Sequence, residues 1–276
     1  ITGNDIAITA LGKFDNNDLF GVDAWSGGQV TLGNPNAQKI CIDVKNEGTR
    51  VAKAVVATDK GGSKIDITAN DVSISASSKN AIGVFSLNEG SSISIKGGSV
   101  SVTAKGEEAK ALQVQNNTEL GDAPANASSV AIDANEIAVT SDHIGIASWS
   151  HGQMNINGNL TVNAKNALDV RGHSTTNINT NGNHSTVLNG DIVFETPATP
   201  QDSHSSGKFI DANVNVNLTG KDSSWTGSAY QEYKTDDADS EYKHVIEMDA
   251  QPFQGNVTGF KLTMADGASW NMTGDS

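Results

Sequence analysis

The chain has 276 residues, of which only 36% are hydrophobic and 5% aromatic, and a formal net charge of −14. A mixed helix-and-sheet enzyme of this size usually contains more apolar residues, whereas a solenoid needs fewer because its core is one thin column. The excess of 32 acidic over 18 basic residues disfavours nucleic acid and anionic membranes as partners, and no apolar run is long enough to span a bilayer.

Segments that alternate apolar with polar residues begin near the N-terminus, and each predicts a short half-buried strand. They occupy residues 6–10, 19–25, 27–33, 40–44 and 52–57. The single cysteine, Cys41, lies on the opposite strand face from Ile40 and Ile42. We expect a partly covered thiol without a disulfide partner.

Residues 62–115 contain the same set of three segments twice, offset by about 28 residues. One set cannot bury its inward Ile and Val side chains alone, but stacking the next set on it closes a continuous core. The sequence therefore predicts an all-β fold, a right-handed parallel β-helix (a three-sheet β-solenoid). The segments are 64–69, 72–76 and 81–85, then 92–96, 100–104 and 111–115.

Similar segments continue to the C-terminus and predict a single domain over 1–276 with roughly nine to ten coils. Turn-forming residues interrupt the pattern and predict protruding loops over 116–128, 195–209 and 226–256. The chain starts and stops abruptly, and we expect it to be a fragment of a longer protein.

Two Trp-containing phrases carry a family resemblance. The stretch from Val214 through Trp225, and the later stretch from Phe260 through Trp270, resemble the C-terminal part of autotransporter (type V secretion) adhesin passenger domains of the pertactin and antigen 43 kind. The resemblance implies export through the outer membrane to the bacterial cell surface. It implies adhesion, either by self-association between neighbouring cells (aggregation, biofilm) or by attachment to a host glycan or matrix protein. The long acidic insertion over 229–255 departs from it, and no Arg-Gly-Asp motif is present.

Two surfaces are candidates for adhesion. Rows of outward Ser, Thr and Asn on stacked coils offer many weak hydrogen bonds to a second copy or to a glycan. The last predicted loop offers tyrosines beside carboxylates, typical of a recognition surface. A hairpin that caps the coil edge explains the tyrosines equally well, and the carboxylates are either calcium ligands or a solvated acidic loop. The predicted loop site comprises Tyr230, Tyr233, Asp236, Asp237, Asp239 and Tyr242.

Catalytic and cofactor motifs are weak. The six histidines lack zinc-binding spacing, and we expect no metal or cofactor. The closing Gly274-Asp275-Ser276 matches only the start of a serine protease motif. A polysaccharide-binding or polysaccharide-degrading β-helix enzyme is the alternative, because Asp169 and Arg171 end a predicted strand. Asp191 and Asp211 end other segments, but their relative positions depend on register. The prediction is a protein without enzymatic activity.

Overall fold

The computed structural model describes residues 1–58, 61–116, 125–181, 184–196, 212–233, 245–246, 260–265 and 267–273. Every helix or strand within these ranges is a β-strand, so the described part of the chain is all-β. It accordingly contains no helix long and apolar enough to cross a membrane.

Apart from β18 (Val245–Ile246), the strands pair in parallel, each with a strand of the next layer, and form three ladders that we name A, B and C. Ladder A comprises β3 (Gln29–Gly33), the first parts of β6 (Lys64–Ser77), β8 (Ser92–Lys105), β10 (Ser129–Ser141) and β12 (Gln153–Arg171), then β13 (Thr175–Ile178), β15 (Asn213–Leu218) and β19 (Phe260–Met264).

Ladder B comprises β1 (Asp5–Gly12), β4 (Lys39–Asn46), later parts of β6, β8, β10 and β12, the start of β14 (Thr186–Thr196), β16 (Ser224–Thr226) and β20 (Ser269–Asn271). Ladder C comprises β2 (Leu19–Trp25), β5 (Ala52–Thr58), β7 (Ile82–Leu87), β9 (Lys110–Gln115), β11 (Ile144–Trp149), the ends of β12 and β14, and β17 (Ala229–Tyr233).

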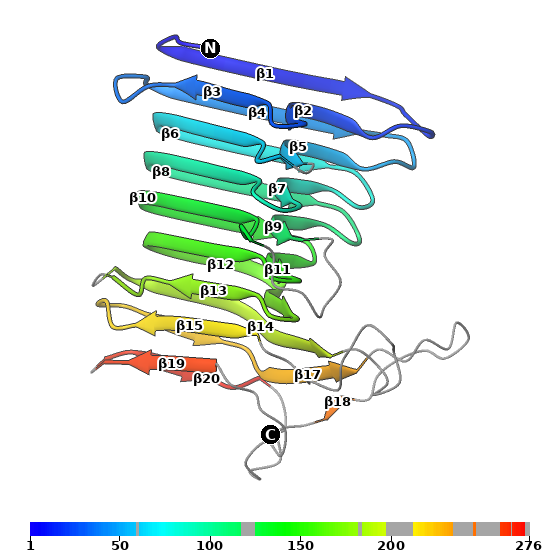
Figure 1. Cartoon of the computed structure of the whole chain (residues 1–276). Coiled ribbons are helices and arrows are strands. Elements are labelled where there is room, and N and C mark those ends of the chain that lie inside the picture. Colours follow the sequence, from blue (N-terminus) through cyan, green and yellow to red (C-terminus); the bar gives the residue numbers. More distant parts are fainter. Residues whose placement is uncertain are drawn as a thin grey trace.

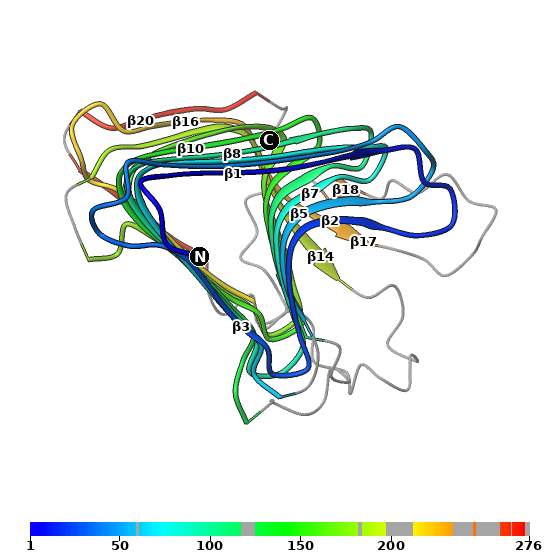
Figure 2. The ribbon, with the colours of Figure 1, turned by 90° about the horizontal axis from the view of Figure 1, so that it is seen from above.

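Successive layers stack along one axis (Figure 1), and the ladders occupy three sides when the stack is viewed from its end (Figure 2). The predicted repeat sets the register, because Ile65 pairs with Ile93, 28 positions later. The prediction of an all-β chain with parallel stacked strands is thus confirmed, and the arrangement is compatible with a β-solenoid.

Inward side chains of the three ladders form one column of apolar residues. Ile67, Ile95, Ile132 and Ile156 follow one another in register, and each is at most 2% exposed. Burial of each such side chain contributes about 1.5–3 kcal/mol. These columns stabilise the stack in the absence of any helix packed against it among the described residues.

Ladders B and C approach closely where β7 begins, and this position requires a very small residue. A Cβ on Gly83 would lie 2.6 Å from the carbonyl oxygen of Ala111 and 2.7 Å from a methyl carbon of Val102. No side chain fits at that distance. The glycine therefore reflects the approach of the two ladders and not a turn.

The two Trp-containing phrases lie one layer apart. Trp225 is fully buried and stacks on Trp270 with a centroid distance of 4.6 Å. Each indole N–H donates to the carbonyl of a glycine, Gly190 for Trp225 and Gly227 for Trp270. The repeated phrase is thus an inward aromatic stack at the C-terminal end of ladder B.

The predicted loops differ from the structure at their ends. Strand β14 extends through Thr196, and β17 lies inside the segment predicted as a loop over 226–256. That segment also contains β18 (Val245–Ile246), which pairs antiparallel with β17. The prediction failed at β17 because its sequence, Ala-Tyr-Gln-Glu-Tyr, contains little of the β-branched character of the earlier strands. The first loop is closed at its base by a hydrogen bond from the Ser128 amide to Asn116 Oδ1, 3.3 Å long.

Candidate functional site: an asparagine-lined groove

A row of asparagines runs across the outer face of ladder A near its C-terminal end. Asn155, Asn177 and Asn215 lie in register on β12, β13 and β15. Asn215 Nδ2 donates to Asn177 Oδ1 over 2.8 Å, and Asn177 Nδ2 donates to Asn155 Oδ1 over 2.9 Å. The three amides therefore form one hydrogen-bonded chain across three layers.

The strand pattern fixes this row in place. Each member is followed by an inward apolar residue, Ile156, Ile178 or Val216, and all three are at most 2% exposed. Because successive side chains of a strand point to opposite faces, burial of these apolar residues turns the asparagines outward. Register is strongly specified wherever one face is buried.

Another asparagine shapes the edge of this face. Asn179 is buried and adopts a left-handed backbone conformation with φ of 53°, which asparagine tolerates better than most residues. Its Oδ1 accepts from the Gly158 amide at 2.9 Å, and its Nδ2 donates to Thr186 Oγ1 at 2.7 Å. Asn217 Nδ2 donates to the Asn179 carbonyl. These bonds anchor the turn that leaves ladder A after β13.

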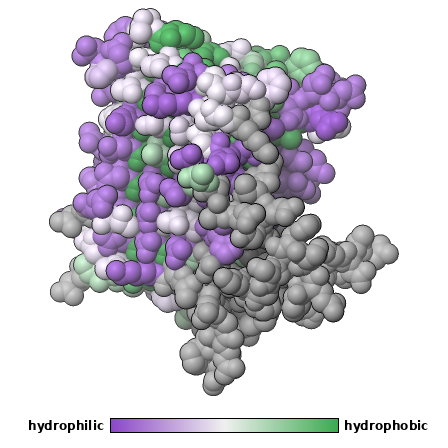
Figure 3. Space-filling model, viewed as in Figure 1, coloured by the Kyte–Doolittle hydropathy of each residue, from purple (hydrophilic) through white to green (hydrophobic). Residues whose placement is uncertain are grey.

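The row and this turn border a shallow groove of about 790 Å³. Hydrophilic side chains predominate on the left of Figure 3, where the outer face of ladder A is visible. Amides, hydroxyls, one lysine and one valine line the groove: Asn155, Asn177, Thr180, Asn181, Asn215, Val216, Asn217, Thr219, Lys261 and Thr263.

The charge of this part of the face differs from the rest of the chain. From Gln153 onward the ladder A strands contain no Asp or Glu, and their one cation is Lys261. Lys261 is exposed and pairs in register with Asn215. The preceding strands of the same face carry Asp66 and Asp133. Within the described strands, an acidic protein thus presents one stretch of outer face that carries no carboxylate.

A second polar cluster lies on ladder C. Asp169 is 1% exposed, and its carboxylate accepts hydrogen bonds from Trp149 Nε1 at 2.7 Å and Arg171 Nε at 2.9 Å. The other carboxylate oxygen accepts from Arg171 Nη2 at 3.1 Å. The Arg171 guanidinium lies 3.8 Å from the Trp149 ring centroid, and Lys110 Nζ lies 5.6 Å from it.

This cluster bears on the predicted enzyme alternative. A general acid or base needs a carboxylate within reach of a substrate proton, whereas both oxygens of Asp169 are engaged by neighbouring donors. Asp191 pairs in register with Asn166 and accepts from the Ser228 amide at 2.9 Å, and Asp169 pairs with Val193. The two carboxylates therefore lie in different columns. Asp211 lies outside the described residues.

His143 lies beside this cluster. Burial lowers the pKa of His143 below its ordinary 6.5, and Lys165 and Lys110 lower that pKa further, whereas Asp169 and Glu108 oppose the shift. Within the described ranges, three acceptors near this cluster have no hydrogen-bond partner: His143 Nδ1, Gln113 Oε1 and Asn166 Oδ1. Gln113 and Asn166 are 4% and 6% exposed, so these acceptors are buried and do not form part of the outer surface.

The structure describes little of the predicted loop site. Tyr230 and Tyr233 belong to β17 and pair in register with Val193 and Thr196. The remaining members, Asp236, Asp237, Asp239 and Tyr242, lie outside the described residues. The predicted loop site therefore remains a prediction.

The structure also locates the cysteine and two of the histidines that the sequence analysis considered. Cys41 is half-buried and unpaired on the outer face of ladder B. His151 and His173 stack with ring centroids 4.7 Å apart. Burial lowers the pKa of His151, and the neighbouring His173 lowers it further. Among the residues that the structure describes, no group of three or more His, Cys, Asp or Glu side chains is arranged to hold a metal ion.

The sequence prediction missed the asparagine row as a distinct site, although a signal for it is present. The triplet Asn–apolar–Asn occurs as Asn155-Ile156-Asn157, Asn177-Ile178-Asn179 and Asn215-Val216-Asn217. A search for one outward residue type repeated at equivalent coil positions would have found it. Comparison of the chain with protein-family models, with curated proteins and with solved structures gives no match.

Proposed function

We propose that this protein is a bacterial cell-surface adhesin, a right-handed parallel β-helix that contacts its partner through the outer face of ladder A. The supporting observation is the groove around Asn155, Asn177 and Asn215, where in-register amides line an open surface and none of the described lining residues is a carboxylate. The resemblance of the Trp225 and Trp270 phrases to autotransporter passenger domains supports export through the outer membrane.

The chemistry of the groove suits adhesion by many weak contacts. Each asparagine amide offers two donor hydrogens and two acceptor lone pairs, and the row uses only one donor hydrogen of Asn177 and one of Asn215. A net hydrogen bond contributes about 1 kcal/mol. Summed over many molecules on one cell, such contacts produce avidity without one tight site. The partner is a second copy on a neighbouring cell or a glycan or matrix protein of a host surface.

The test displays the chain on non-adherent bacteria and blocks the groove after folding. Cys41 is replaced by serine, and a single thiol is introduced with Asn177→Cys. Cell aggregation and attachment to host-cell layers are measured before and after alkylation with a bulky maleimide polymer. We expect alkylation to abolish the adhesion that the same cells show beforehand, because the adduct fills the groove.

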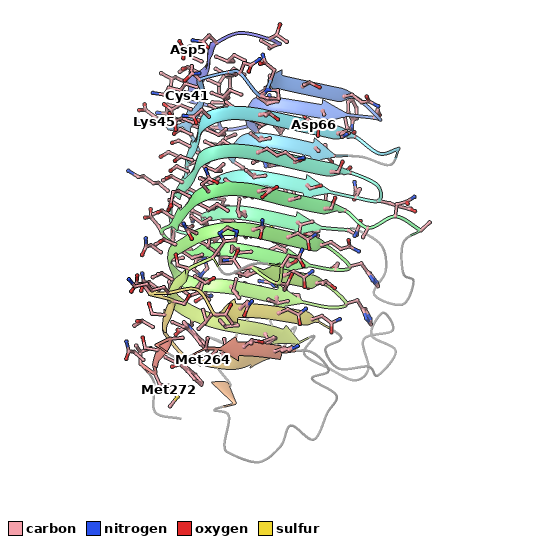
Figure 4. All side chains as sticks on the ribbon, turned by 90° about the vertical axis from the view of Figure 1, so that its left-hand side faces the viewer. Asp5, Cys41, Lys45, Asp66, Met264 and Met272 are labelled. Atoms are coloured by element: carbon pink, nitrogen blue, oxygen red, sulfur yellow. The ribbon has the colours of Figure 1, made fainter. Side chains whose placement is uncertain are left out.

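The matched control is Asp66→Cys, on the same outer face but near the opposite end of the stack (Figure 4). Alkylation there should leave adhesion unchanged. Adhesion that survives the adduct at position 177 would remove the groove from the proposal. Cells displaying the unmodified chain that neither aggregate nor attach would contradict the adhesin function itself.

A further inference from the structure

We propose that the groove binds a linear polysaccharide whose sugars carry carboxylates, lying along the stacking axis with about one sugar per layer. This inference rests on the adhesin function proposed above and specifies the ligand of the same face. The charge of the face, the layer spacing and the unused hydrogen-bonding capacity of the amides support it.

The charge of the face favours an acidic ligand. A chain with a net charge of −14 repels polyanions over most of its surface. The ladder A strands from Gln153 onward contain no carboxylate, and Lys261 contributes a positive charge to the groove. Lys261 has no ion-pair partner among the described residues. A ligand carboxylate at Lys261 therefore meets one unpaired ammonium and no nearby competing acid on these strands.

The spacing of the row favours a linear sugar chain parallel to the axis. Adjacent layers are about 4.8 Å apart, which is close to the length that one pyranose unit adds to an extended β-linked chain. Asn155, Asn177, Asn215 and Lys261 occupy four successive strands of ladder A. Each of them can thus contact one sugar of a bound chain.

The amide row suits sugar hydroxyl groups, which donate and accept as the amides do. Asn215, Asn177 and Asn155 form a donor-to-acceptor chain in which each bond polarises the next. The two hydrogens on Asn155 Nδ2 and one on each other amide remain for a ligand. None of the described residues that line the groove is aromatic, so the contacts argued here are hydrogen bonds and charge and not ring stacking.

The test compares two β-1,4-linked oligosaccharides of equal length that differ only at C6: oligoglucuronate, with a carboxylate, and cello-oligosaccharide, with a hydroxymethyl group. Titration calorimetry of the purified chain at low salt should give at least tenfold tighter binding of the acidic oligomer. Lys261→Gln should reduce that affinity about tenfold. The matched control Lys64→Gln, on the same face outside the groove, should leave it unchanged.

A length series tests the orientation without any variant. Affinity for oligoglucuronate should rise up to about four sugars and then level off, because four layers contribute contacts. Equal affinity for the acidic and the neutral oligomer, absence of binding to either, or an unaltered affinity in Lys261→Gln would overturn the inference. If the displayed chain still mediates adhesion in those cases, the adhesin function stands with a different ligand.

Discussion

The outer faces of ladder A and ladder C have the same strand geometry but different environments. Along ladder A the outward residues Asp66, Asn177 and Lys261 are exposed or half-buried. Along ladder C the outward residues Phe85 and Asp169 are 7% and 1% exposed, and Phe85 packs with Val56 and Ile82 in a cluster separate from the main core. The outer face of ladder A is therefore open to a partner. The outer face of ladder C buries these side chains in its middle layers, although Phe20 and Trp25 on β2 are 38% and 68% exposed.

A side chain on the outward side of a strand is therefore not necessarily exposed to solvent. The ladder A part of β6 alternates, as in Lys64-Ile65-Asp66-Ile67, whereas β5 and β7 have consecutive buried residues, such as Val55 and Val56. A strand buried on both faces has a continuous apolar run. Loss of alternation in β5 and β7 therefore indicates that their outward side chains are covered, whereas β2 of the same ladder has exposed outward residues.

The largest expected loss of folding stability follows from removing the buried carboxylate of ladder C. Asp169→Ala removes the hydrogen bonds that the Asp169 carboxylate accepts from the Trp149 indole N–H and from two N–H groups of Arg171. Removing one partner of a buried ion pair costs about 3–5 kcal/mol, and we expect a value near the lower limit because the remaining Arg171 side chain is 25% exposed. Chemical denaturation should show a loss of stability of this size. A change below about 1 kcal/mol would mean that Asp169 is solvated and that this face is open.

Truncating an apolar side chain on the outer face of ladder C should reduce folding stability almost as much. Phe85→Ala removes a large side chain from the cluster with Val56 and Ile82, and we expect a loss of about 3 kcal/mol. Ser94→Ala, on the outer face of ladder A, should change the free energy of unfolding by less than about 0.5 kcal/mol. Similar values for the two variants in thermal unfolding would abolish the distinction between the faces.

Stability should fall in mild acid because of two histidines. Burial lowers the pKa of both His143 and His151 in the folded protein, so the unfolded chain binds protons first as the pH falls below 6.5. The histidine contribution to stability is therefore complete above this pH and decreases below it. Denaturation midpoints across this range should decline, and His143→Gln with His151→Gln should flatten the decline. An unchanged slope would contradict these pKa shifts.

The smallest expected change in folding stability follows from removing an exposed ion pair on ladder A. Lys64 Nζ lies 3.0 Å from Asp66 Oδ2, and the two side chains are 50% and 36% exposed. Exposed pairs contribute about 0–1 kcal/mol and are screened by salt. Asp66→Asn should therefore change stability by less than about 1 kcal/mol in a denaturant titration. A loss comparable to that of Asp169→Ala would show that ladder A is not a solvated face.

Much of the fold was predictable because period-2 alternation and a 28-residue offset determine which strands pair and which side chains turn inward. The prediction did not recover the continuous strands β6 and β8, each of which joins two predicted segments around a corner. It also missed β17, where alternation is weak.

The candidate site was harder to predict, because it depends on register between distant segments. Asn177 and Asn215 are 38 positions apart, and only the pairing of β13 with β15 brings their amides together. The polar cluster at Trp149 depends likewise on the register of β11 with β12. The prediction included rows of outward Ser, Thr and Asn as one adhesive surface, but it named individual residues only in the loop.

The most direct measurement is carbene footprinting of the displayed chain, free and after attachment, with mass-spectrometric quantification for each peptide. The account predicts protection of the peptides that contain Asn155, Asn177, Asn215 and Lys261, with no change in peptides containing Asp66 or Phe85. Protection confined to ladder C or to the N-terminal end of the stack would contradict the claim that the outer face of ladder A meets the partner.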